Sequence, residues 1–171
     1  MRKVFFILYT ILSFQILAQD NDHDHENEEH DHEHDHFHKN ELGISLSPTI
    51  YLKEGEVSLG AHMHYIHRIG DSRFGAGLGF EAVFDDHKHR TFSTVFQWSP
   101  TYRTHICVAP GFVIAEHEHM GDLEKEYHWA CHFEVVREFH LGPIDIGPFF
   151  EWALEEEDQH IGIGVHVGIP F

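Results

Sequence analysis

The strongest constraint in this sequence is a period-two alternation of apolar and polar residues that runs from Glu41 to Phe171. Alternation of this kind places apolar side chains on one face of a β-strand and polar ones on the other. No 3.6-residue helical pattern competes with it, and turn-forming residues separate the alternating runs. We therefore predict an all-β fold of eight strands, near residues 41–52, 56–69, 73–84, 90–99, 102–115, 125–136, 141–154 and 159–171.

The composition of the polar face favours one of two barrel architectures. A water-soluble barrel packs its apolar residues inside, whereas a membrane barrel turns them outward toward lipid. Here the polar face is rich in glycine, as at Gly75, Gly77 and Gly79 in one strand and Gly162 and Gly164 in another. Glycine suits the crowded interior of a small, curved barrel. We predict a single eight-stranded antiparallel up-and-down β-barrel with bulky residues outside; a soluble periplasmic barrel is the alternative.

Aromatic residues are predicted to gather at both ends of this barrel. Membrane barrels carry aromatic girdles where lipid meets water. An up-and-down strand order collects Tyr65, Phe74, Trp98, Tyr102 and Phe171 at one end, and Phe84, Phe92, Tyr127, Trp129 and Trp152 at the other.

The N-terminus has the pattern of a secretory signal. Arg2 and Lys3 precede an apolar run that ends at Ala18 and is too short for a comfortable membrane span. No cysteine near Ala18 is available for a lipid anchor. The predicted organisation is a signal peptide over 1–18, a disordered His/Asp/Glu-rich segment over 19–40, and the barrel over 41–171.

With these features the sequence resembles the small eight-stranded outer-membrane β-barrels of Gram-negative bacteria, such as OmpX and the OmpA transmembrane domain. The resemblance rests on the signal peptide, the even strand count and the final strand "HIGIGVHVGIPF", which ends in Phe171. It implies a location in the outer membrane, contact with lipid, and a periplasmic N-terminal tail. The connections, such as "KEGE" at 53–56, are shorter than that family would suggest.

The segment "DHDHENEEHDHEHDHFHKN" (22–40) contains seven histidines and eight carboxylates. Little in it can be buried, so we predict that it is disordered. Imidazole suits zinc, copper, nickel and iron, and the carboxylates attract cations. An acidic solubilising or pH-responsive tail is the alternative. The candidate ligands are His23, His25, His30, His32, His34, His36 and His38.

Acids and histidines also recur in the predicted outward connections at 85–89, 116–122 and 155–160. Because alternate connections of an up-and-down barrel meet at one mouth, we expect these three to lie together. Each loop taken alone could equally be a solvated loop. The candidate metal ligands are His87, His89, His117 and His119.

Further candidate ligands fall on the inward face. They are His62, His64, Glu81, His128 and His132, with His105, Glu134, Asp145, Glu151 and His166 on the same face. A tight turn at Asp71 and Ser72 should place His62 opposite Glu81. The alternative is a stabilising hydrogen-bond network in which Arg68 and Arg103 pair with the acids.

Charge and cysteine content narrow the functional classes. Loss of Arg2 and Lys3 with the signal changes the net charge from −18 to −20, which would repel nucleic acid and attract cations. Cys107 and Cys131 fall on opposite faces of their strands, so we predict no disulfide. We find no convincing serine–histidine–acid arrangement and predict no enzyme.

These observations predict a non-enzymatic barrel that binds transition-metal ions, with Zn²⁺ as the first choice, and that assists metal uptake or homeostasis together with a receptor or transporter. A purely structural outer-membrane barrel is the alternative.

Overall fold

The computed structural model describes residues 38–53, 55–85, 88–119, 122–156 and 158–171, with only the backbone at 117–119 and 122–124. The predicted signal peptide, residues 19–37 of the predicted disordered segment, and His87 lie outside the described residues. So do the tail ligands His23, His25, His30, His32, His34 and His36.

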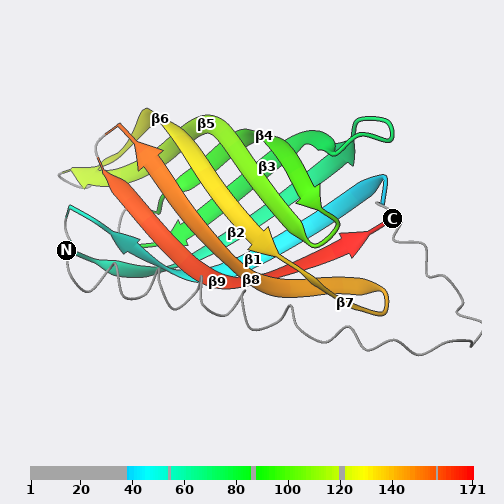
Figure 1. Cartoon of the computed structure of the whole chain (residues 1–171). Coiled ribbons are helices and arrows are strands. Elements are labelled where there is room, and N and C mark those ends of the chain that lie inside the picture. Colours follow the sequence, from blue (N-terminus) through cyan, green and yellow to red (C-terminus); the bar gives the residue numbers. More distant parts are fainter. Residues whose placement is uncertain (1–37, 54, 86–87, 120–121, 157) are drawn as a thin grey trace, which may run out of the picture. The chain divides into compact units, whose positions relative to one another are not determined.

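The described chain forms nine β-strands joined mainly by short connections (Figure 1). They are β1 (Asn40–Tyr51), β2 (Val57–Arg68), β3 (Phe74–Phe84), β4 (Arg90–Thr101), β5 (Thr104–His119), β6 (Asp122–Arg137), β7 (Phe139–Leu141), β8 (Ile144–Glu155) and β9 (Gln159–Pro170). Most predicted boundaries are correct to within three residues.

Antiparallel pairing closes these strands into a barrel. Each long strand pairs with its neighbour in sequence, β9 returns to pair with β1, and β6 pairs with β8. The three-residue β7 continues the line of β6 and pairs with the beginning of β8. The described strands therefore occupy eight positions around the barrel, which confirms the predicted fold class. We call the end at which β1 begins and β9 ends the tail end, and the opposite end the loop end.

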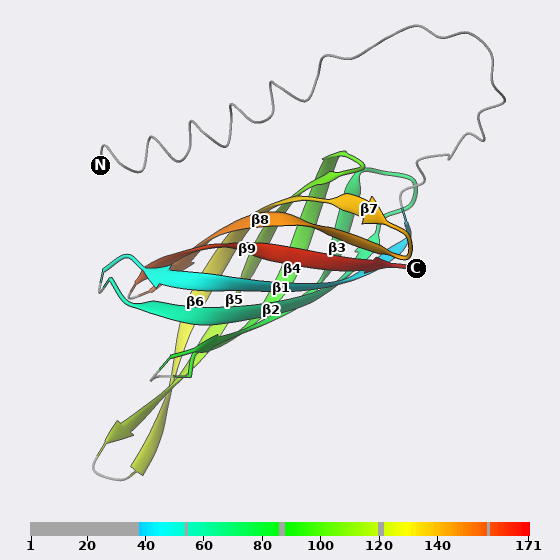
Figure 2. The same cartoon turned by 90° about the horizontal axis from the view of Figure 1, so that it is seen from below.

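The prediction of a loop at 116–122 is wrong for most of its length. Strand β5 continues to His119 and β6 begins at Asp122, so the two form a hairpin that extends past the neighbouring strands (Figure 2). Opposite charges support it at its base, because Glu116 lies opposite Lys125 in the register and within 3.8 Å of its ammonium group. Alternating charged residues can continue a ladder when opposite charges face each other across it.

The predicted turn at 137–143 is also wrong in detail. The chain leaves β6 at Arg137, passes through the buried Glu138, and continues as β7. The reversal comes only after Leu141, where Gly142 has a φ of 66°. That backbone conformation is open to glycine at little cost, so Gly142 sets the position of the turn.

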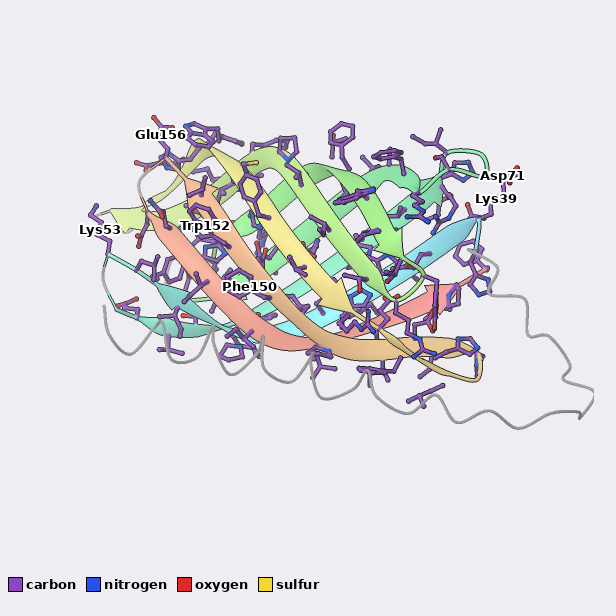
Figure 3. The ribbon with its side chains drawn as sticks, in the orientation of Figure 1. Lys39, Lys53, Asp71, Phe150, Trp152 and Glu156 are labelled. Carbon is purple, nitrogen blue, oxygen red and sulfur yellow. The ribbon has the colours of Figure 1, made fainter. Side chains whose placement is uncertain are left out.

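Apolar side chains cover the exterior, as predicted. Leu46 is 54% exposed, Leu78 68% and Trp129 55%, and all ten residues of the two predicted aromatic groups are exposed. Figure 3 shows charged Lys39 and Asp71 at one end of the barrel, Lys53 and Glu156 at the other, and the aromatic rings of Phe150 and Trp152 between them. An exposed apolar surface of this extent is typical of a face that contacts lipid.

Glycine allows close contact between strands on the inner face. A Cβ atom at Gly79 would collide with the Ser93 hydroxyl of β4 and would lie 3.1 Å from Nε2 of the buried His62. The glycine-rich face therefore lies inside the barrel, as its composition predicted.

Cys107 is buried inside the barrel, whereas Cys131 is partly exposed on the other face, and both are free thiols. The prediction of no disulfide is confirmed. No helix among the described residues has the length and apolar character needed to cross a lipid bilayer.

Candidate metal centres inside the barrel

The interior of the barrel is lined with imidazole and carboxyl groups. Among the described residues, the buried histidines and glutamates are His62, His64, His105, His132, His160, His166, Glu81, Glu134, Glu138 and Glu151. The inward positions predicted for His62, His64, Glu81 and His132 are thus confirmed, and His62 lies opposite Glu81 in the β2–β3 register. Because inward residues alternate with outward ones, the same strands that present apolar groups outside supply these groups inside.

A central cluster is formed by Glu81 of β3, His132 of β6, Glu151 of β8 and His160 of β9. One ligand atom from each of these four side chains lies within 4.8 Å of the others, and all four side chains are buried. His132 Nδ1 lies 2.6 Å from Glu151 Oε1 and 3.3 Å from Glu81 Oε2. His160 Nε2 lies 3.7 Å from Glu81 Oε1. Two imidazoles and two carboxylates form a donor set that suits a transition-metal ion.

A second group, the tail-end cluster, consists of Glu41, His64, His105, Glu138 and His166. His166 Nε2 lies 3.1 Å from Glu138 Oε1 and 3.6 Å from Glu41 Oε1. His64 Nε2 lies 3.4 Å from Glu41 Oε1, and its ring stacks on that of His166 at 5.2 Å between centroids. The Nε2–H of His105 donates to Glu138 Oε2 at 2.8 Å.

His62 and Glu134 lie between the two clusters. His62 Nδ1 is 2.9 Å from Glu134 Oε1 and the ring of His62 is 5.4 Å from that of His64. Both of these atoms are buried. Other buried atoms without a hydrogen-bond partner in the described chain include His132 Nε2, both ring nitrogens of His160, and Glu81 Oε2.

Among the described residues, the buried polar side chains include no lysine or arginine. Arg68 and Arg103, which we considered as partners for the acids, are only half-buried. The Arg68 guanidinium donates to the carbonyl oxygens of His38 and Ser72, while that of Arg103 lies 4.8 Å from the Tyr102 ring centroid. The buried carboxylates therefore face imidazoles, which balance their charge only when protonated or when a cation is shared between them.

At the loop end, His89 contacts Asp85, and the Tyr51 hydroxyl donates to Asp85 Oδ2 at 2.9 Å. Burial alone raises the pKa of the Asp85 carboxyl, but the hydrogen bonds from His89 and Tyr51 outweigh it and lower the pKa to about 2. For His89, burial lowers the pKa, and the Asp85 carboxylate outweighs that effect and raises it. Asp85 and His89 thus form an ion pair at the mouth.

The other predicted loop and rim residues that the structure describes lie at the two ends of the barrel. His128 is only half-buried, with Nε2 3.3 Å from Glu126 and Nδ1 3.7 Å from Glu156 at the loop end. His117 and His119 lie on the extended part of β5, opposite Glu124 and Asp122 in the register. His38 is exposed at the tail end, just before β1.

Sequence reasoning did not select three of the ligands. His160 was assigned to a loop, Glu138 to a turn, and Glu41 only to the start of a strand. The two-residue alternation of a strand identifies His160 and Glu41 as inward residues. His160 shares its face with Gly162 and His166, and Glu41 shares its face with Ser45. Glu138 is four residues from Glu134 and would therefore lie on the same face of a continuous strand.

Ser45 forms an arrangement that we did not predict. The Ser45 hydroxyl lies 2.9 Å from His166 Nδ1, and His166 Nε2 faces Glu138, which together give a serine–histidine–acid order. Ser45 is only 1% exposed. The backbone on either side of it pairs with β2 and β9. The described structure thus holds this hydroxyl in the barrel interior, in contact with His166.

No protein-family model matches the chain, and no curated protein matches it. Solved structures do match its fold. Ail, the attachment invasion locus protein of Yersinia pestis, aligns with a TM-score of 0.56 at 12% identity, over 80% of this chain and 100% of Ail. The N-terminal β-barrel domain of Pseudomonas aeruginosa OprF aligns with a TM-score of 0.53 at 11% identity, over 78% of this chain and 99% of that domain.

A de novo designed transmembrane β-barrel aligns with a TM-score of 0.50 at 8% identity, over 75% of this chain and 95% of the design. The chain therefore has the fold of the small eight-stranded outer-membrane β-barrels, and the predicted resemblance is confirmed at the level of fold.

Proposed function

We propose that this protein is a non-enzymatic β-barrel of the bacterial outer membrane that binds a transition-metal cation inside the barrel, with Zn²⁺ as the preferred ion. The membrane location is supported by the exposed apolar belt between charged ends and by the fold that the chain shares with Ail and OprF. The proposed orientation places the tail end and the histidine-rich segment in the periplasm.

The observation that carries the metal proposal is the central cluster. Its four ligand atoms come from four different strands, lie within 4.8 Å of one another, and are buried without lysine or arginine among them. Two carboxylates balance the charge of a divalent ion, so binding would relieve the cost of burying them. Two imidazoles favour zinc, copper or nickel over calcium or magnesium, which prefer oxygen ligands.

The histidine-rich segment and the loop histidines complete the proposal. The segment would capture ions loosely, because an unstructured chain imposes no coordination geometry and must be ordered when metal binds. The barrel would hold one ion more tightly, because the strands already hold its ligands near one another. The protein would then assist metal uptake or homeostasis alongside a receptor or transporter.

Calorimetry and metal analysis of the mature chain in lipid bilayers test this proposal. The double variant His132→Gln/His160→Gln should lose one tightly bound zinc. Replacing the tail histidines by glutamine should remove only the weaker binding and leave that ion in place. Cobalt(II) bound to the wild type should show the absorption spectrum of a site with nitrogen and oxygen ligands, and the double variant should not.

His140→Gln is the matched control for the double variant, since His140 is exposed and pairs with Asp145. Failure of the wild type to bind zinc, copper or nickel with micromolar or tighter affinity would contradict the proposal. So would equal tight binding by the wild type and the double variant.

A further inference from the structure

The ligand groups in the barrel are not isolated from one another, because three of them overlap. The first consists of His62, His64 and Glu134, the second of Glu41, His64 and His166, and the third of Glu41, His105 and Glu138. In each group the ligand atoms lie within 4.8 Å of one another. His64 belongs to the first and second groups, and Glu41 belongs to the second and third.

The overlapping groups continue the central cluster toward the tail end. His62 lies opposite Glu81 in the β2–β3 register, and Glu134 lies opposite Glu151 in the β6–β8 register. At the loop end, Glu155 Oε1 lies 3.3 Å from His160 Nδ1. We call this whole series, from Glu155 and His160 to Glu138 and His105, the interior file.

Several atoms of the file face one another without bonding. Buried atoms without a hydrogen-bond partner in the described chain occur in every part of it, at His160, Glu134 and His166 Nε2 among others. His166 Nε2 and Glu138 Oε1, which lie 3.1 Å apart, are both among these atoms. Pairs of acceptors and ring nitrogens in this state can hold a shared cation between them.

The tail end of the file is accessible from a small cavity. Its lining includes His38, Glu41 and Arg68, together with Gln97 and Ser99, whose side chains contact His105. His38 and Lys39, the last residues before β1 begins at Asn40, line this cavity.

From this geometry we infer that the interior file passes a divalent transition-metal cation stepwise between the central cluster and the tail end of the barrel. The inference rests on the proposed function and extends it from binding to transfer. The shared ligands His64 and Glu41 are the physical reason. An ion that moves among the three overlapping groups keeps one ligand while it exchanges the others, so it is never without protein contacts in a low-dielectric interior. The step from the central cluster has no shared ligand and depends on His62 lying opposite Glu81 and on Glu134 lying opposite Glu151.

The packing of the interior supports ligand exchange over passage of a hydrated ion. Side chains largely fill the space inside an eight-stranded barrel. No lysine or arginine is fully buried along the file in the described chain, and the fixed positive charges nearest to it are Lys39 and Arg68, which line the cavity at the tail end. The transferred ion would be held by imidazole and carboxylate groups throughout.

Zinc entry into vesicles tests the inference directly. The mature protein is reconstituted in phosphatidylcholine–phosphatidylglycerol vesicles that contain a zinc-sensitive dye, and Zn²⁺ is added outside. The wild type should admit zinc faster than protein-free vesicles. Glu41→Gln and His64→Gln, which change only the shared ligands, should each slow entry by about tenfold or more and still bind one zinc at the central cluster.

Gly43→Ala provides a second way to block the file without removing a ligand. A methyl group at Gly43 would collide with the rings of both His64 and His166, and these side chains would have to move apart. His140→Gln on β7 is the control and should admit zinc at the wild-type rate. Heat-dependent gel mobility confirms that each variant is folded, and a trapped fluorescent dextran reports leakage.

The outcomes separate the two proposals. A wild type that binds zinc at the central cluster and admits it no faster than empty vesicles overturns the transfer inference and leaves the proposed function intact. Equal entry rates for the wild type, Glu41→Gln, His64→Gln and Gly43→Ala overturn it as well. Loss of all zinc binding inside the barrel means that the proposed function itself has failed.

Discussion

Alternate residues of the same strands build two surfaces of opposite chemistry. On the exterior, Leu78 is 68% exposed and Trp129 is 55% exposed, and the neighbouring side chains are of similar kind. On the interior, Glu151 is 1% exposed and His160 is fully buried, and each depends on particular partners. The exterior needs only sufficient apolar area, so one large apolar residue can replace another. The interior needs charge balance, so a single change leaves an ionisable group without its counterpart.

The largest expected effect comes from breaking the interior. His132→Leu removes the imidazole that faces both Glu81 and Glu151. We expect it to lower the free energy of unfolding by about 3–5 kcal/mol, since two buried carboxylates lose their partner. Urea titration of the protein in bilayers, with a metal chelator in the buffer and tryptophan fluorescence as the signal, measures this change.

The double variant His132→Leu/Glu151→Leu is the control for this comparison. Removal of one carboxylate along with the imidazole should recover at least about 1 kcal/mol, because less unpaired charge stays buried. A single variant as stable as the wild type would show that these charges are not buried as the structure places them.

A smaller effect is expected on the exterior. Leu46 lies in the middle of β1 and is 54% exposed. Leu46→Arg should lower the free energy of unfolding in a bilayer by about 2–4 kcal/mol, because the charge would lie in hydrocarbon. The matched variant Leu46→Phe should have little effect. In a water-soluble barrel the arginine would be nearly neutral, within about 0.5 kcal/mol, and that result would contradict the membrane location.

The smallest expected effect concerns the mouth, where Asp85 and His89 lie in the connection between β3 and β4. The Asp85 pKa is lowered from 3.8 to about 2, so its contribution to stability is present above about pH 4 and is lost as the pH falls toward 2. The His89 pKa is raised above 6.5, so its contribution is complete below that value and is lost as the pH rises through the raised pKa.

The pair should therefore be strongest between about pH 4 and pH 6.5. Asp85→Asn should cost about 1 kcal/mol in that range, a modest value because the site is partly exposed, and less at higher pH. Unfolding curves of the wild type and the variant between pH 4 and pH 9 measure this difference. A difference that grows with pH would contradict the assignment.

Much of the fold could be predicted from single residues and their spacing. The two-residue spacing of Leu42, Ile44 and Leu46 determined the outward face of β1, and the glycines of β3 indicated which face was crowded. Turn residues gave most of the strand boundaries. The β5–β6 hairpin was missed because its charged, histidine-rich sequence has the composition of a loop, although it pairs residue by residue as a ladder.

The candidate ligands were predictable only in part. The alternation of inward and outward residues placed His62, Glu81 and His132 inside the barrel, and a local turn placed His62 opposite Glu81. His160 and Glu138 were missed because each was treated as part of a connection. The grouping of Glu81, His132, Glu151 and His160 could not be predicted. These residues come from four different strands, and Glu81 on β3 is far in sequence from the other three.

The sequence by itself determined that alternate residues point to opposite faces and that the polar face is the crowded one, because both follow from the two-residue period of a strand and the small size of glycine. Only the tertiary structure decided which inward residues meet. That depends on the pairing of β1 with β9 and of β6 with β8, which fixes the height of each strand around the closed barrel.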